Sequence, residues 1–154
     1  MNLPLRRMIR VFVLVVALIF SGIVRFAPGA MAATNLAKQP AIDVNVALGN
    51  DGGALQFFPA DLEFEPGRRY NLHLSNPSSQ KHYFTAKDFA DGIWSQKVDA
   101  GNVEIKGAIH ELELRANTKA DWVFVPLRSG TYSLRCTVPG HTEAGMVGTI
   151  KVLG

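Results

Sequence analysis

Apolar residues recur with a period of two over most of this 154-residue chain, and this pattern restricts the fold more than any other feature. In the segment 42–48 (IDVNVAL), aliphatic side chains would share one face of a strand and polar ones the other. Further strands are predicted at 61–65, 69–75, 110–115, 120–126, 131–136 and 147–153, separated by turn pairs such as Pro-Gly, Asn-Pro and Ser-Gly. Short strands at this spacing predict an all-β fold, an antiparallel Greek-key β-sandwich.

One segment departs from this alternation. Residues 85–96 (TAKDFADGIWSQ) begin with Thr85, and Asp88 follows three positions later, a spacing found at helix starts. We expect a short helix or an ordered loop there. It would interrupt the sandwich without changing its class.

The first 32 residues resemble a secretory signal peptide. Basic residues at 6, 7 and 10 precede an apolar run at 11–24, and Ala-Met-Ala at 30–32 provides a cleavage site. The run is shorter than the ~20 residues of a membrane-spanning helix. The sequence therefore predicts a signal peptide at 1–32, a leader at 33–40 and one folded domain at 41–154. The protein would be exported to a periplasm or an equivalent lumen, and an uncleaved N-terminal membrane anchor is the less favoured alternative.

Export removes most of the positive charge. The formal net charge is +3, but four of the 16 basic residues lie in the first 32, so 16 − 4 = 12 would face 13 acidic ones. A near-neutral domain gives no support for a nucleic-acid partner. No phosphate-binding glycine loop or nucleophile-elbow motif occurs, and the carboxylates do not form a pair suited to acid-base catalysis.

A single cysteine stands out in an exported chain, because it cannot form an internal disulfide. Cys136 ends a predicted strand with its side chain on the inner face, and Met146 begins the next strand. A loop between paired strands brings its ends together, so Cys136 and Met146 should be neighbours, with His141 at the tip between them. Three potential metal ligands thus converge.

The ligand types favour copper. A thiolate with imidazoles and a weak thioether is the blue-copper arrangement, whereas zinc sites in small domains usually contain paired cysteines. A second imidazole must come from elsewhere in the chain. His82 follows a loop at a strand end and is the preferred candidate; His110 is the alternative, and His73 is expected to face solvent.

The segments NPSSQKHYF and GTYSLRCTVPGHTEAGMVGTIKV resemble the cupredoxin, or blue copper, family over most of residues 42–153. The C-x4-H-x4-M spacing is similar to that of rusticyanin-like members rather than to that of plastocyanin. The resemblance implies a cupredoxin-like copper-binding domain with one copper ion, cycling between Cu(I) and Cu(II). The implied ligands are His82, Cys136, His141 and Met146. Many members carry asparagine directly after the first histidine, tying the two ligand loops together, but this chain has Tyr83.

The resulting hypothesis is a soluble, monomeric electron carrier that is not an enzyme. Four side chains would leave copper without an open position for substrate, and redox proteins would dock transiently near His141. No stable membrane insertion is expected after signal cleavage. Two alternatives are a copper-handling protein (a chaperone, scavenger or sensor) that uses the same ligands and a metal-free sandwich that serves in adhesion or assembly.

Overall fold

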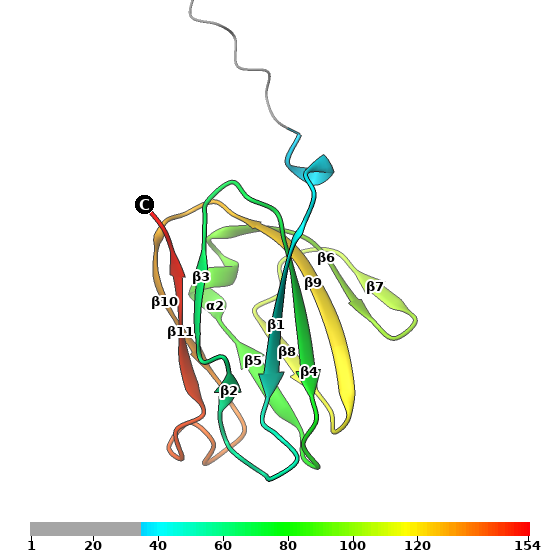
Figure 1. Cartoon of the computed structure of the whole chain (residues 1–154), viewed down its shortest axis with the longest axis vertical. Helices are drawn as coiled ribbons and strands as arrows, with labels where there is room; N and C mark the ends of the chain where they lie inside the picture. The colour runs from blue at the N-terminus through cyan, green and yellow to red at the C-terminus, as the bar shows by residue number, and fades with distance from the viewer. Residues whose placement is uncertain (1–34) are drawn as a thin grey trace, which may run out of the picture. The chain divides into compact units, whose positions relative to one another are not determined.

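The computed structural model describes residues 35–154, which form a two-layer β-sandwich (Figure 1). The predicted signal peptide lies outside the described residues. Most of the predicted leader is described, and it contains a 3-10 turn, η1 (Leu36–Lys38), ahead of the first strand. No helix in this part of the chain has the length and hydropathy of a membrane span.

The first sheet has six strands in the order β2-β1-β4-β9-β6-β7. They are β1 (Ile42–Leu48), β2 (Phe57–Phe58), β4 (Tyr70–Asn76), β6 (Ile93–Ala100), β7 (Val103–Ile105) and β9 (Thr118–Pro126). The second sheet has five strands in the order β3-β11-β10-β5-β8. These are β3 (Asp61–Phe64), β5 (His82–Thr85), β8 (Glu111–Leu114), β10 (Gly130–Arg135) and β11 (Val147–Val152).

The predicted β-sandwich is therefore confirmed, with a correction to its strand directions. Two pairings are parallel, β1 with β4 and β3 with β11, so the sheets are mixed rather than purely antiparallel. The chain leaves the first sheet after β2, runs through β3 in the second sheet, and returns to place β4 alongside β1. Such a crossing brings two strands into one sheet in the same direction, which alternation within each strand cannot reveal.

The alternating apolar residues meet between the sheets and form one core. Its centre is aromatic: Phe124 contacts Phe64 and Phe89 edge to face, with ring centroids 5.3 and 5.4 Å apart, and Trp122 lies 5.4 Å from Phe124. Trp122 donates its indole N–H to the Ser95 hydroxyl at 2.9 Å, so its polar atom is satisfied inside the sandwich.

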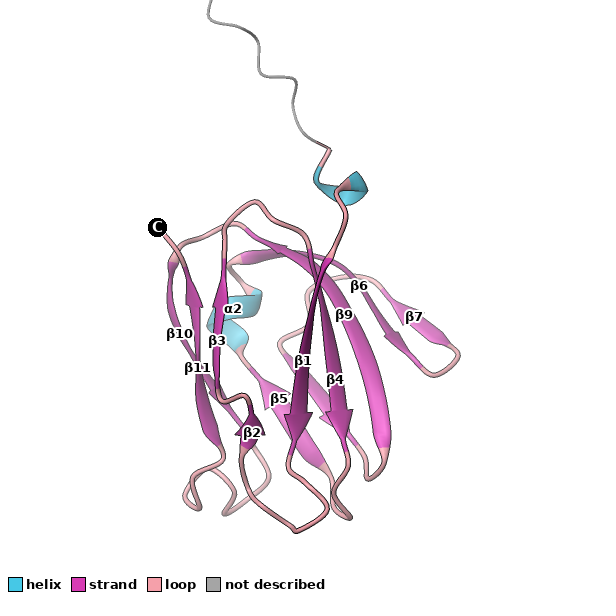
Figure 2. Ribbon diagram, in the orientation of Figure 1, coloured by secondary structure: helices cyan, strands magenta, loops and turns pink. Residues whose placement is uncertain are grey.

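The segment 85–96 is only partly helical. A four-residue helix, α2 (Lys87–Ala90), follows β5, but the chain becomes strand β6 again at Ile93 (Figure 2). Phe89 packs this short helix onto the core, because its ring is 1% exposed and stacks against Phe64. The sequence pattern missed β5, which has only four residues, and β6, whose alternation is broken by a bulge between Ser95 and Lys97.

The sandwich brings several loops together at one end. The turn after β1, the loop between β4 and β5 and the loop between β10 and β11 all lie at the lower end in Figure 1, opposite the C-terminus. The second of these loops leads into His82 at the start of β5, and the third contains Cys136, His141 and Met146.

Candidate metal centre

The loop between β10 and β11 places Cys136 and Met146 side by side. The Cys136 amide donates to the Met146 carbonyl at 3.0 Å, and the Met146 amide donates to the His141 carbonyl at 2.8 Å. Thr142 closes the loop from inside, since its hydroxyl donates to the Cys136 carbonyl at 2.7 Å. Gly145 adopts a φ of +101°, a left-handed conformation that allows the chain to turn directly before Met146. The predicted proximity of residues 136 and 146 is confirmed.

Strand β5 brings the second imidazole to this loop. His82 and Phe84 point into the sandwich, whereas Tyr83 and Thr85 point outward, as expected for a strand. His82 is therefore fully buried and faces Cys136 from the neighbouring strand. Ring centroids of His82 and His141 are 5.1 Å apart, so both imidazoles flank the thiol.

The distances fit a trigonal metal site. Nδ1 of His82 lies 3.9 Å from Sγ of Cys136, and Nδ1 of His141 lies 3.5 Å from it. Metal–sulfur and metal–nitrogen bonds of about 2.3 and 2.0 Å at an angle of 120° would separate sulfur from nitrogen by about 3.7 Å. One ligand atom from each of the three residues lies within 4.8 Å of the others. A single ion can thus be bound by all three.

Met146, the predicted fourth ligand, ends the same loop as Cys136 and His141. Its side chain is 0% exposed, and its backbone is hydrogen-bonded to both Cys136 and His141. A thiolate, two imidazoles and a thioether match the preferences of copper, since sulfur ligands favour Cu(I) and imidazoles suit both of its oxidation states.

Burial prepares His82 for metal binding. Desolvation, and secondarily the neighbouring His141, lower the pKa of His82 below its ordinary value of 6.5. The ring therefore stays neutral at pH 7 and keeps a lone pair available. Its other nitrogen, Nε2, has no hydrogen-bond partner among residues 35–154 and lies near the backbone of Gly49.

The four predicted ligands differ in their access to solvent. His82, Cys136 and Met146 are 0% exposed, and His141 is 8% exposed. Pro139 and Ala144 are exposed on the same loop, and Val147 is exposed where β11 begins. Any contact between the centre and another molecule would therefore pass through His141 rather than through the other three residues.

The remaining two histidines lie outside this cluster. His73 is on the outer face of β4, where its two ring nitrogens contact Asp121 at 2.6 Å and Asp43 at 2.9 Å. His110 is exposed and contacts Asp91 at 2.7 Å. The structure thus places His82, and not the alternative His110, beside Cys136 and His141.

Asn76 holds the loop that leads to His82, and the sequence reading did not single it out. Its buried side chain donates to the Gln80 carbonyl at 2.8 Å and to the Leu114 carbonyl at 2.9 Å. Its carbonyl oxygen accepts from the Ser78 amide and hydroxyl. Since Leu114 is the cross-strand partner of His82, this network sets the position of β5. In the sequence, the Asn-Pro pair at 76–77 indicates only a turn.

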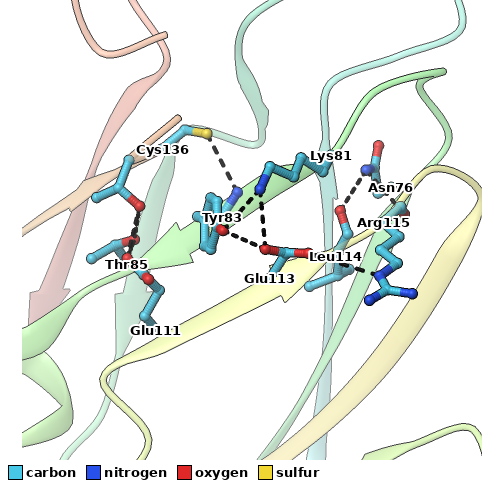
Figure 3. A network of polar contacts seen from close by, with 10 residues as sticks. Asn76, Lys81, Tyr83, Thr85, Glu111, Glu113, Leu114, Arg115 and Cys136 are labelled. Atoms are coloured by element: carbon cyan, nitrogen blue, oxygen red, sulfur yellow. Dashed lines mark hydrogen bonds and ion pairs between the residues drawn. The ribbon is translucent and has the colours of Figure 1, made fainter. Parts of the chain in front are cut away.

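Tyr83 directly follows His82, and its backbone amide forms a hydrogen bond with the sulfur of Cys136. Its amide donates to Sγ of Cys136 at 3.3 Å, and Figure 3 shows this bond beside the polar contacts of its side chain. The Tyr83 hydroxyl donates to Glu113, and Lys81 lies 3.2 Å from the same hydroxyl. The cysteine sulfur therefore keeps a hydrogen-bond donor from the neighbouring strand inside the buried cluster.

Comparison with known families agrees with this chemistry. Residues 44–153, well over half of the chain, match the family described as copper binding proteins of the plastocyanin/azurin family. The match includes all four residues of the candidate centre. Copper is therefore the cofactor that this fold and this cluster of side chains accommodate.

Solved structures with the same fold include other copper proteins. Auracyanin B is 24% identical, with a TM-score of 0.54 over 76% of this chain and 92% of that one. Auracyanin A, a "blue" copper protein from Chloroflexus aurantiacus, is 18% identical, with a TM-score of 0.52 over 74% and 100%. A multicopper oxidase from Aquifex aeolicus has a TM-score of 0.58 at 13% identity, but only 30% of its length is covered. At these identities the similarity establishes the fold.

Proposed function

Because the chain belongs to the plastocyanin/azurin family of copper-binding proteins, we propose that it is an electron carrier whose copper ion is held by His82, Cys136, His141 and Met146. The observation that carries this proposal is the buried cluster itself. Two imidazoles lie 3.5 and 3.9 Å from one buried thiol, and a buried methionine is bonded to the same loop. With Met146 as a fourth ligand, the ion would have no open coordination position for a substrate. This arrangement supports electron transfer rather than catalysis.

Copper in such a site would supply a one-electron redox couple, and the protein would determine the barrier to electron transfer. Strands β5, β10 and β11 of one sheet hold the ligand-bearing segments in place, and the Tyr83 amide donates a hydrogen bond to Sγ of Cys136. A ligand set that is fixed by packing changes little when the charge of the ion changes. Little rearrangement means a small barrier to electron transfer.

His141 is the proposed route for the electron. It is 8% exposed, whereas the other three proposed ligands are 0% exposed, and its neighbours include exposed Pro139 and Ala144 on the same loop and Val147 at the start of β11. We expect a redox protein to dock there, because a small and mostly apolar contact permits fast release after transfer.

We also propose that the protein works outside the cytoplasm. This part of the proposal is supported by the composition of residues 1–32 and the near-neutral charge of the remainder. N-terminal sequencing of protein recovered from a periplasmic fraction is the test. A mature terminus near residue 33 is expected, and recovery of the intact chain in the membrane fraction would favour the anchor.

The ligand assignment is tested by absorption after addition of Cu(II). The protein should show an intense blue or green thiolate-to-copper charge-transfer band. Cys136→Ala and His82→Ala should lose it, whereas the matched control His110→Ala should retain it. A coloured Cys136→Ala variant would contradict the assignment.

The carrier role needs a second measurement, because a copper-handling protein could use the same residues. Cyclic voltammetry should give a reversible one-electron couple, and a Cu(I) chelator should remove the ion slowly. Rapid and complete transfer of Cu(I) to the chelator would favour copper delivery over electron transfer.

A further inference from the structure

We infer that Glu111 is a positioning residue that clamps the cysteine-bearing loop to the histidine-bearing strand. This inference rests on the proposed ligands. Thr85 and Thr137 each donate a hydroxyl hydrogen bond to the same carboxylate oxygen of Glu111, both at 2.7 Å. The two hydroxyl oxygens lie 3.3 Å apart. Three segments distant in sequence, β5, β8 and the start of the ligand loop, therefore meet at one atom.

The clamp lies where the sheet stops holding the two segments together. Strands β5 and β10 pair at one position only, Arg135 with Thr85. Past this pair the strands must separate to leave room for an ion between His82 and Cys136. Thr85 belongs to the last backbone pair, and Thr137 lies just beyond it, so their shared carboxylate bridges the strands where the backbone pairing ends.

Strand β8 is well placed to provide this carboxylate. It is an edge strand that pairs with β5, and Glu111 lies directly opposite Thr85 in the register. The next outward pair, Tyr83 with Glu113, is also joined through its side chains (Figure 3). Cross-strand hydrogen bonds on one face of a sheet stabilise its register. These carboxylates thus brace β5 from outside, although their alternation in the sequence resembles an ordinary solvated face.

Beyond the one backbone pair, β5 is joined to the cysteine-bearing loop by the backbone bond from Tyr83 to Sγ of Cys136 at 3.3 Å and by the Thr85–Glu111–Thr137 group. A hydrogen bond to a charged acceptor is about twice as strong as one between neutral groups. A carboxylate shared by two hydroxyls can therefore hold the loop even though Glu111 and Thr137 are exposed to solvent.

The test compares Glu111→Ala and Thr137→Val with the control Glu143→Gln. Thr137→Val removes one donor and keeps the charge. Glu143→Gln removes a charge from the same loop, and no hydrogen bond or ion pair reaches Glu143 within residues 35–154. Glu111→Ala and Thr137→Val should each release Cu(I) to a chelator about tenfold faster and change the ratio of the charge-transfer bands. The control should stay within about twofold of the parent protein.

Two further results separate a clamp from a general loss of stability. Glu111→Gln keeps an oxygen that accepts from both hydroxyls and should recover most of the slow release. The double variant Glu111→Ala with Thr137→Val should be no worse than either single variant, because both remove one unit. Release rates equal to those of Glu143→Gln, or additive effects in the double variant, would overturn the inference.

A measurement on copper-free protein keeps this test independent of the ligand assignment. Hydrogen exchange of the Tyr83 amide should accelerate in Glu111→Ala and in Thr137→Val but not in Glu143→Gln. Unchanged exchange in both clamp variants would reject the clamp even if the parent protein binds copper as proposed. Absence of the charge-transfer colour from the parent protein after Cu(II) addition would instead reject the ligand assignment.

Discussion

Gly49 offers a sharp test of how closely the fold packs around the proposed ligand His82. It lies just after β1 with a φ of +77°. A Cβ added there would lie 2.9 Å from Nε2 of His82 and 3.2 Å from the carbonyl oxygen of Ala54. Gly53, in the same turn region, has a φ of +78° but no atom within 4 Å of an added Cβ. Replacing each glycine with alanine therefore separates backbone strain from contact with the imidazole.

The expected magnitudes differ between the two variants. Both alanines carry the cost of a left-handed backbone, about 1 kcal/mol. In Gly49→Ala, the contact to Nε2 must also lengthen from 2.9 Å to 3.4 Å, where ordinary van der Waals contact begins, so the ring must retreat by about 0.5 Å. Overpacking of this kind typically costs about 1–3 kcal/mol. We expect total losses of about 1 kcal/mol for Gly53→Ala and about 3 kcal/mol for Gly49→Ala.

The site should respond in the same order. Binding sites tolerate displacements of only about 0.5 Å, so Gly49→Ala should weaken copper binding by about tenfold and shift the charge-transfer band. Gly53→Ala should leave both unchanged. Urea denaturation of the copper-free proteins measures the stability, and competition with a chelator measures the affinity. Equal losses in both variants, with identical spectra, would show that the contact between Gly49 and His82 has no role.

Three other perturbations address the core, the outer face and the loop before the site. Phe89→Ala should destabilise the protein by about 3–5 kcal/mol, measured by urea denaturation, because it empties an aromatic site that is 1% exposed. Hydrogen bonds to Asp43, and then to Asp121, raise the pKa of His73 above 6.5. Their contribution should be complete below about pH 6.5 and decline as the pH rises through the raised pKa, measured by the melting temperature. Asn76→Ala should cost about 3 kcal/mol and weaken copper binding, measured by denaturation and chelator competition, since it removes several buried hydrogen bonds.

Matched controls accompany these three predictions. Trp94→Ala removes a larger ring that is 37% exposed and should cost less than Phe89→Ala. His73→Asn should flatten the pH dependence, and an unchanged profile would place its origin elsewhere. Ser79→Ala, an exposed change in the loop that Asn76 holds, should leave stability and copper affinity intact. Comparable losses in Ser79→Ala and Asn76→Ala would show that the buried network is not what orders the loop.

Local patterns predicted the fold well where strands were long and flanked by turns. Strands β1, β4, β9, β10 and β11 lie within two residues of their predicted bounds. The four-residue strands β3 and β8 were also predicted, because turn residues follow both, but β2, β5, β6 and β7 were missed. Strand β5, which carries His82, has only four residues and runs into a helix-like start signal, and a bulge between Ser95 and Lys97 breaks the alternation of β6.

The residues of the cluster around Cys136 also differ in how well local sequence predicted them. Cys136, His141 and Met146 belong to one strand-loop-strand, so their spacing alone predicted that they meet. The residues around each histidine could not decide whether His82 or His110 is the second ligand. Each histidine directly precedes an outward-facing residue, in the adjacent strands β5 and β8. The structure brings His82 to the thiol and leaves His110 beside Asp91.

The amino-acid sequence alone specifies a sandwich of short strands and a loop that brings a cysteine sulfur and an imidazole together. Both features depend on residues that are close together in the chain. Tertiary structure decided the second imidazole, the parallel strand pairs, the hydrogen bonds of Asn76 and the bridge through Glu111. Each of these joins segments that are distant in sequence. Their contacts depend on how the two sheets pack and on register, and neither is encoded within any single segment.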